Sequence, residues 1–178
     1  MPGLNITPAP ASNETYARQM LRIEHASFSD LPALVDLENR LFQEDAAKYD
    51  THVDLTWAAR KGATDFERLL ANSDCVVLVA RNEERAVVGH LVGYASESSP
   101  TRSPVTYANL RSLYVLPVHR RKGMADLLVS GFLLWARSRG CAEAHVDSYA
   151  LNEPAQLLYE RRGFAIRSVS RSIDLTSP

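Results

Sequence analysis

The segment 113–129, LYVLPVHRRKGMADLLV, joins a strand-like run to an amphipathic helix through a short basic turn. Residues 105–116 are rich in β-branched and aromatic side chains, which favour a strand. From Met124 onward, apolar residues recur at the spacing of one helix face, and Gly140 ends the pattern. A strand that leads directly into a long helix restricts the chain to folds in which helices pack on a sheet.

The turn between this strand and this helix carries Arg120, Arg121, Lys122 and Gly123. The first N–H groups of a helix lack partners inside the helix and carry a partial positive charge, so a helix start favours anions. Gly123 lets the backbone approach a ligand without a Cβ in the way, and Ala125 is small for the same reason. These residues predict a diphosphate site. On the pattern alone, a solvated basic loop is the alternative.

The composition narrows the possible classes of protein. The 178 residues suit one domain, and 46% hydrophobic with 23% charged residues is ordinary for a globular chain. We expect a flexible tail over 1–18, which is rich in Pro, Ala, Ser, Asn and Thr, and a single domain over 19–178. The formal net charge of −1 and the lack of an aromatic–basic pattern argue against nucleic acid as a partner.

Targeting and metal signals are also missing from the sequence. No apolar run reaches transmembrane length and the first residues hold no apolar signal core, so we expect a cytoplasmic protein without a membrane partner. Cys75 and Cys141 are expected to be free thiols, as in a reducing compartment. The five histidines do not pair at metal-ligand spacing, and we expect no metal.

Periodicity and turn residues predict the remaining elements. Strands are expected over 20–26, 75–81, 86–96, 105–116, 141–149 and 165–175. Helices are expected over 29–42, with Asp30 as N-cap, over 124–139, and over 152–164, with Asn152 as N-cap. Residues 55–74 predict one or two short helices interrupted near Gly62, and 43–54 predict a loop. This order predicts an α+β (mixed α/β) fold, a mixed sheet with helices on both faces.

Two motifs in the sequence resemble the GNAT superfamily of N-acetyltransferases. The first is [RQ]-x-x-G-x-[GA] between a strand and a long helix, found here from Arg120 to Ala125. The second is an Asn at the start of the next helix, followed by Ala and then by LYE and GF. Here it reads Asn152, Ala155 and LYERRGF over 158–164. The two motifs are separated by one predicted helix and one predicted strand, as in the family.

The resemblance implies a central mixed, mostly antiparallel sheet whose fourth and fifth strands splay apart to hold acetyl-CoA as co-substrate. The backbone of 113–115 would pair with the pantetheine arm, and the amides of 121–126 would hold the pyrophosphate. Asn152 would reach the pantetheine region. The implied cofactor-binding residues are Leu113, Tyr114, Val115, Arg120, Arg121, Lys122, Gly123, Met124, Ala125, Asp126, Asn152, Ala155 and Tyr159.

The resemblance also implies direct transfer of the acetyl group to a primary amine in a ternary complex. The Val115 backbone N–H is a candidate donor to the thioester oxygen, and Tyr159 is a candidate general acid for the leaving thiolate. Packing of Tyr159 into the core is the alternative. The base stays open, because the strand 105–116 has no carboxylate and Asn109 stands where some members have a glutamate. The candidates are Glu44, Asp45, Asp147 and His145, more weakly His90 and Tyr107, and otherwise solvent.

The acidic segment 42–54 falls where the family meets its acceptor. Glu44 and Asp45, together with Asp147, are the residues predicted to contact the substrate. An acidic rim favours a small cationic amine such as a polyamine, an aminoglycoside-like compound or an amino-acid derivative. An ordinary solvated face, a peptide or protein amine, and a non-catalytic acyl-CoA sensor are the alternatives. A homodimer through the exposed closing strand is also possible on these residues.

Overall fold

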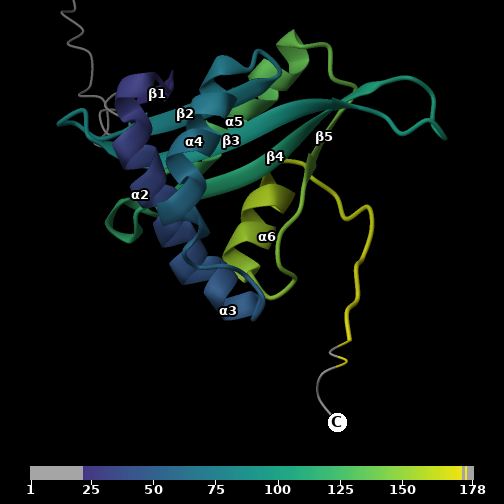
Figure 1. The fold of residues 1–178 in the computed structure, drawn as a ribbon. Coiled ribbons are helices and arrows are strands. Elements are labelled where there is room, and N and C mark those ends of the chain that lie inside the picture. Colours follow the sequence, from purple (N-terminus) through teal and green to yellow (C-terminus); the bar gives the residue numbers. More distant parts are fainter. Residues whose placement is uncertain (1–21, 174, 176–178) are drawn as a thin grey trace, which may run out of the picture.

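The computed structural model describes residues 22–173 and residue 175, so the predicted tail over 1–18 lies outside the described residues. Its centre is a five-stranded sheet in the order β1 (Arg22–His25), β2 (Cys75–Arg81), β3 (Val87–Glu97), β4 (Thr106–Val115) and β5 (Glu143–Val146) (Figure 1). Neighbours from β1 to β4 are antiparallel, whereas β4 and β5 are parallel. The predicted mixed, mostly antiparallel sheet is confirmed.

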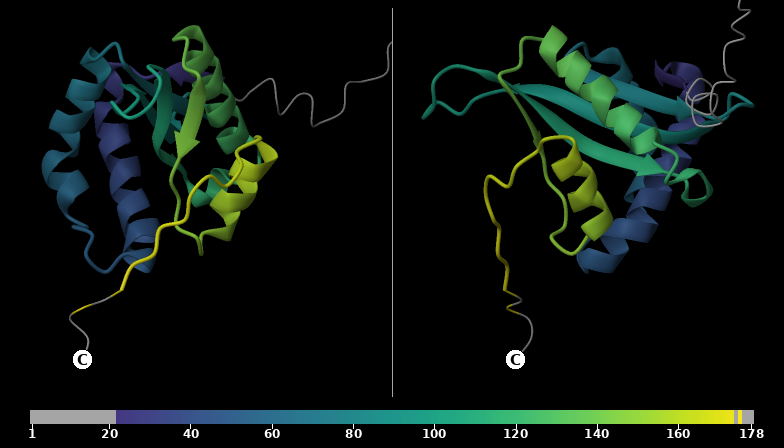
Figure 2. Two further views of the ribbon diagram at one scale, coloured as in Figure 1. Left: turned by 90° about the vertical axis from the view of Figure 1, so that its right-hand side faces the viewer. Right: turned by 180° about the vertical axis from the view of Figure 1, so that it is seen from behind.

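Helices cover both faces of this sheet, as predicted. On one face lie α2 (Leu31–Leu41) and α4 (Trp57–Ala71), and on the other lie α5 (Met124–Ser138) and α6 (Glu153–Arg161) (Figure 2). Short 3-10 turns, Phe28–Asp30 and Pro117–His119, precede α2 and follow β4. Each face has its own core. Phe132 and Leu128 of α5 fill one, and Leu34 and Phe66 fill the other.

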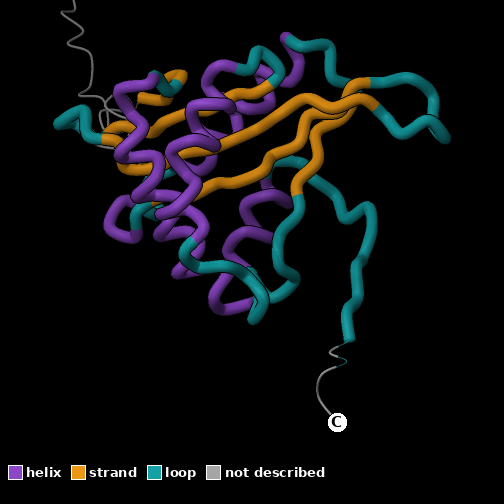
Figure 3. The backbone as a smooth tube through the Cα atoms, in the orientation of Figure 1, coloured by secondary structure: helices purple, strands orange, loops and turns teal. Residues whose placement is uncertain are grey.

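Helix α2 continues further than the sequence predicted. It passes through a π-helical turn, η2 (Phe42–Ala46), hereafter the π-turn, into the short helix α3 (Ala47–Tyr49), so the predicted loop over 43–54 is wrong for its first half (Figure 3). Tertiary contacts hold this extension: the Tyr49 hydroxyl donates to the Leu151 carbonyl over 3.2 Å, and its ring packs on Tyr149. The predicted interruption of α4 near Gly62 is also wrong, because the helix runs unbroken.

The end of the chain departs most from the prediction. The expected closing strand is wrong, because residues 164–173 form no strand. This exposed segment passes β5 near Arg167 and then runs away from the sheet (Figure 3). β5 itself is shorter than the predicted 141–149. The segment forms no ladder with β5, although the side chain of Arg167 contacts Glu143 and His145 of that strand.

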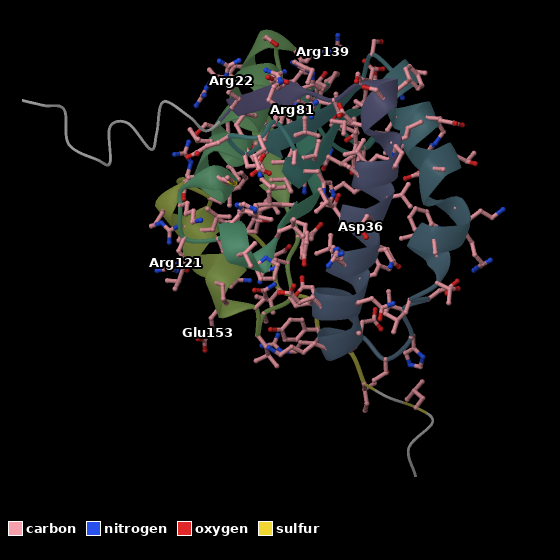
Figure 4. The ribbon with its side chains drawn as sticks, turned by 90° about the vertical axis from the view of Figure 1, so that its left-hand side faces the viewer. Arg22, Asp36, Arg81, Arg121, Arg139 and Glu153 are labelled. Atoms are coloured by element: carbon pink, nitrogen blue, oxygen red, sulfur yellow. The ribbon has the colours of Figure 1, made fainter. Side chains whose placement is uncertain are left out.

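Arg81 ties the first strand to the first helix. It donates to Glu24 of β1 at 2.9 Å and to Asp30 before α2 at 2.9 and 3.1 Å (Figure 4). Asp30 makes no side-chain cap on α2, so the predicted cap is replaced by this ion pair. The carboxylate and guanidinium are both largely buried, which makes the contact part of the folded core.

We expect Gly93→Ala to lower the free energy of unfolding by about 1–3 kcal/mol, because overpacking a filled core is destabilising. Gly93 lies at the bulge between β3 and β4, and a Cβ there would come within 2.5 Å of Phe132 Cε2. Urea unfolding followed by circular dichroism measures the loss. Adding Phe132→Leu removes the overlapping atoms, so the double variant should lose less than the sum of the single losses. Additive losses would contradict this explanation.

Candidate active site

β4 and β5 part at one end of their shared ladder. Their pairing ends at Leu110 and Val146, and β4 then runs on to Val115. Just past this point the register between β3 and β4 shifts, which leaves Arg111 as an extra, bulged residue in β4. The predicted gap between the fourth and fifth strands therefore begins at a β-bulge, and β5 offers no ladder partner to β4 beyond it.

The backbone of β4 presents a free edge to this gap. Leu116 N–H donates to the Val88 carbonyl at 2.9 Å, while Val115 lies opposite Gly89. In an antiparallel ladder this makes Val115 a non-hydrogen-bonded position, so its N–H and carbonyl point away from β3. Leu113, two residues earlier, faces the same way. An extended amide chain such as pantetheine can add to this edge as a further strand.

The basic turn after β4 has the backbone of an anion site. Arg121 has φ +61° and Gly123 has φ +84°, so two left-handed residues fall within three positions before α5 starts. Tight turns of this kind concentrate backbone N–H groups, and the first turn of α5 adds its own unpaired N–H groups. The Arg121 side chain points outward beside this turn (Figure 4). Met124 is buried beneath the turn, which anchors it to the core.

The Arg120 side chain connects the basic turn to strand β4 and to the π-turn. Its Nε donates to the Val115 carbonyl at 2.8 Å, and its two terminal nitrogens donate to Glu44 of the π-turn at 2.5 and 2.8 Å. The Tyr114 hydroxyl donates to the same carboxylate at 2.8 Å. The hydrogen bond from Arg120 holds the pKa of Glu44 below its usual value. Burial and the bond to Glu44 raise the pKa of Tyr114 to about 12.

Asp45, the residue after Glu44, contacts the opposite wall of the gap, at the start of α6. Asp45 accepts a hydrogen bond from Asn152 Nδ2 at 2.8 Å, while Asn152 Oδ1 caps α6 by accepting from Ala155 N–H at 3.2 Å. Burial, and then the charge of Glu44, raises the pKa of Asp45. Two adjacent acids of one π-turn thus connect the basic turn to the start of α6. Neither contact was predicted, because the sequence gives no signal for a π-turn.

Tyr159 lies on α6 at the edge of the α5 core. It is 9% exposed and packs edge-on against Phe164, with ring centroids 5.7 Å apart. Burial, with a smaller contribution from the charge of Asp45, raises the pKa of its hydroxyl to about 12. The side chain therefore stays protonated at neutral pH, as a proton donor must. The structure therefore shows the packing role that was the alternative for Tyr159, and this role is compatible with proton donation by its hydroxyl.

A cavity of about 220 Å³ opens where the two strands part. It brings together Asn109, His145 and Asp147, which the sequence singled out, with two residues that it did not, Tyr94 and Arg111. The full lining is Tyr94, Asn109, Leu110, Arg111, His145, Val146 and Asp147. The predicted acceptor residues Glu44 and Asp45 do not line this cavity. They contact the two walls of the gap instead.

His145 is held from both sides at the rim of the cavity. Its Nε2 lies 2.9 Å from Glu143 and 2.6 Å from Arg167 of the C-terminal segment. Its ring packs on Tyr107 with centroids 4.7 Å apart. Tyr107 therefore supports His145 and does not line the cavity itself.

His90 is buried away from this cavity. Its Nε2 lies 2.8 Å from Glu38 and 3.4 Å from Ser112, and both His90 and Glu38 are almost fully buried. Burial would raise the pKa of Glu38, but the hydrogen bond and charge of His90 and the charge of Arg111 outweigh it and lower that pKa. His90 is thus part of a buried polar network beneath the site.

Comparisons with known proteins agree with this geometry. The family described as Acetyltransferase (GNAT) family matches residues 31–164. Aminoglycoside N(6')-acetyltransferase type 1 of Acinetobacter haemolyticus is 25% identical over 146 residues, which cover 81% of this chain and 90% of that protein. Homo sapiens N-acetyltransferase 8 is 32% identical over 138 residues, which cover 78% of this chain and 56% of that protein.

Solved structures share the fold. A structure of AAC(6')-Iy in complex with a bisubstrate analogue superposes with a TM-score of 0.66 at 20% identity, covering 89% of this chain and 98% of that chain. Apo aminoglycoside 6'-N-acetyltransferase AAC(6')-IG of Acinetobacter haemolyticus gives a TM-score of 0.62 at 24% identity, covering 86% and 99%.

The chain belongs to the GNAT acetyltransferase family, as the two sequence motifs predicted. It is an acetyl-CoA-dependent N-acetyltransferase, with acetyl-CoA as co-substrate. Among residues 22–173, no group of three or more His, Cys, Asp or Glu is placed to hold a metal ion. In the same part of the chain, no helix has both the length and the apolar character needed to cross a membrane.

We expect Gly123→Val to weaken acetyl-CoA binding about tenfold or more, because a β-branched residue disfavours the left-handed backbone on which the turn depends. Calorimetric titration with acetyl-CoA measures the affinity. Gly140→Val is the matched control, since Gly140 is also left-handed, with φ +70°, and neither glycine has an atom within 4 Å of an added Cβ. It should cost similar stability but leave the affinity unchanged. Equal losses of affinity in both variants would argue against the turn as the diphosphate site.

Proposed function

We propose that this enzyme transfers the acetyl group of acetyl-CoA directly to the primary amine of a small cationic molecule, in a ternary complex. One observation carries the proposal: the free backbone edge of β4 lies between the basic turn and the cavity. A donor bound along that edge would place its thioester at the mouth of the cavity. An acceptor amine in the cavity could then attack without an acetylated enzyme in between.

The two walls of the gap are proposed to hold acetyl-CoA. The backbone of Leu113 and Val115 would pair with the pantetheine amides, and the N–H groups of 121–126 would receive the pyrophosphate. Arg121 and Lys122 add positive charge at the turn. Arg120 stabilises the shape of the turn by its ion pair with Glu44. Asn152 and Ala155 would bound the pantetheine at the start of α6.

The proposed chemistry needs two groups of this chain at the reacting centre. The Val115 N–H would donate to the thioester oxygen as negative charge develops on it. A carbon–nitrogen bond forms, the carbon–sulfur bond breaks, and the Tyr159 hydroxyl would give its proton to the departing thiolate. The attacking amine must also lose a proton. His145, Asp147 or solvent water can accept it, since both side chains line the cavity.

The acidic residues divide into two proposed roles. We assign Asp147 to the acceptor, because it lines the cavity. We assign Glu44 and Asp45 to the cofactor walls, because their carboxylates bind Arg120 and Asn152. The names of the aminoglycoside-acetylating relatives support a small amine as acceptor. We place the reaction in the cytoplasm, where free cysteines such as Cys75 and Cys141 persist.

The proposal is tested by release of free CoA from acetyl-CoA across polyamines, aminoglycosides, amino acids and short peptides. Turnover of any small amine supports it. Binding of acetyl-CoA, seen as a rise in melting temperature, without turnover of any amine would favour a cofactor sensor instead. Turnover restricted to peptides would move the acceptor class to peptide or protein amines.

We expect Tyr159→Phe to keep acetyl-CoA affinity but to lower kcat about tenfold or more, because the variant loses the proton donor and keeps the ring. Steady-state kinetics and acetyl-CoA titration measure the two effects. Tyr149→Phe is the control, since Tyr149 lies before α6 and packs on Tyr49 instead. An unchanged kcat in Tyr159→Phe would leave that residue only its packing role.

We further propose that two copies of the chain form a homodimer through residues 165–175. This segment exposes 68–86% of Ile166, Val169, Ile173 and Leu175, and its Arg167 contacts Glu143 of the edge strand β5. Exposed apolar side chains next to an open strand edge favour pairing with another chain. Light scattering should find a dimer that Val169→Lys with Ile173→Lys converts to monomer. Leu134→Lys, on the exposed face of α5, should stay dimeric; a monomeric wild type would refute the proposal.

A further inference from the structure

Arg111 brings a guanidinium to the acceptor cavity. The β-bulge places it beside the point where β4 and β5 part, and its side chain is 27% exposed. Its ion pairs use one nitrogen: Nη2 lies 2.6 Å from Asp65 and 3.7 Å from Glu38. Among the described residues, its Nε and Nη1 have no hydrogen-bond partner. These two N–H groups are therefore available to a ligand.

The surrounding groups fix this guanidinium in place. Burial would raise the pKa of Asp65, but hydrogen bonds from Arg68 and Arg111 outweigh it and keep the carboxyl ionised. The guanidinium carbon also lies 5.8 Å from the centre of the Trp57 ring. A guanidinium held by charge and by an aromatic face loses little freedom when it binds a ligand. Arg111 is thus organised before any acceptor arrives.

Groups of both charges surround the cavity. Of the residues that line it, Asp147 is the one with a carboxylate, whereas Arg111 carries a fixed positive charge. Arg167 lies against His145 at the rim, where it pairs with Glu143. One positive and one negative group across a cavity match a ligand that carries both charges.

The volume of the cavity points to a small ligand. At about 220 Å³ it lies below the roughly 300–1,000 Å³ usual for pockets that enclose drug-sized molecules. A bulky multi-ring amine would stand mostly outside it. An amino acid or a compound of similar size fits the space between Arg111 and Asp147.

We propose that Arg111 binds a carboxylate of the acceptor, and that the acceptor is a small amine of the amino-acid class. The inference rests on the proposed acetyl transfer and names its substrate. The Nε or Nη1 N–H of Arg111 can donate a charge-assisted hydrogen bond to a carboxylate. The ammonium group of the same molecule would lie toward Asp147, near the open edge of β4. Arg111 is then a specificity-determining residue, with Asp65 and Trp57 as its supports.

The test compares each of a set of amino acids with its own amide, and lysine with cadaverine, which differs by the missing carboxylate. We expect kcat/KM for the acid to exceed that for its uncharged counterpart about tenfold or more. Arg111→Gln should bring the ratio close to one, and Arg111→Lys should give an intermediate value. Arg102→Gln, in the exposed loop between β3 and β4, is the control and should keep the wild-type ratio.

The ratio of acid to amide does not depend on the fraction of active enzyme, so partial unfolding of an Arg111 variant does not distort it. If Arg111→Gln does not fold, the ratio of acid to amide measured for the wild type and for Arg111→Lys tests the inference instead. Equal use of acid and amide by the wild type, or an unchanged ratio in Arg111→Gln, overturns the inference. Preference for cadaverine or an aminoglycoside also overturns it and leaves the acetyl transfer intact. No turnover with any amine refutes the acetyl transfer itself.

Discussion

The end of the parallel ladder at Leu110 and Val146 is the constraint on which the rest of the site depends. A strand whose neighbour departs keeps a row of backbone groups that need partners, and an extended amide chain can supply them. The cavity opens at the same departure. The bulge at Arg111 lies at this point and places a guanidinium at the cavity.

The two walls of the gap, the basic turn and the start of α6, are joined by side-chain contacts. The π-turn at the end of α2 does this with adjacent carboxylates, Glu44 to Arg120 and Asp45 to Asn152. Exposed ion pairs are individually worth little, but Glu44 binds both terminal nitrogens of Arg120, and two-pronged pairs are the stronger kind. π-turns are frequent at functional sites because they redirect side chains that a regular helix would aim elsewhere.

Particular residues show how far prediction from sequence reaches. The turn at Gly123 and the apolar face of α5 were predicted, because both depend on residue types at neighbouring positions in the sequence. The loop expected over 43–54 and the strand expected over 165–175 were wrong. In the first, distant partners such as Leu151 stabilise helix; in the second, the segment forms no ladder with β5, the strand that it contacts. From the sequence, Glu44 and Asp45 were predicted to form a free acidic rim, because their partners Arg120 and Asn152 lie far away along the chain.

The sequence by itself determined the order of the five strands and of helices α2, α4, α5 and α6, the basic turn, the N-cap at Asn152 and membership of the family. These depend on neighbours within a few positions, which the chain cannot rearrange. Only the tertiary structure decided which acids contact the two walls of the gap, that His90 is buried against Glu38, and that Arg111 lines the cavity. The physical reason is that charge and hydrogen bonding act through space, between residues that only the folded sheet brings together.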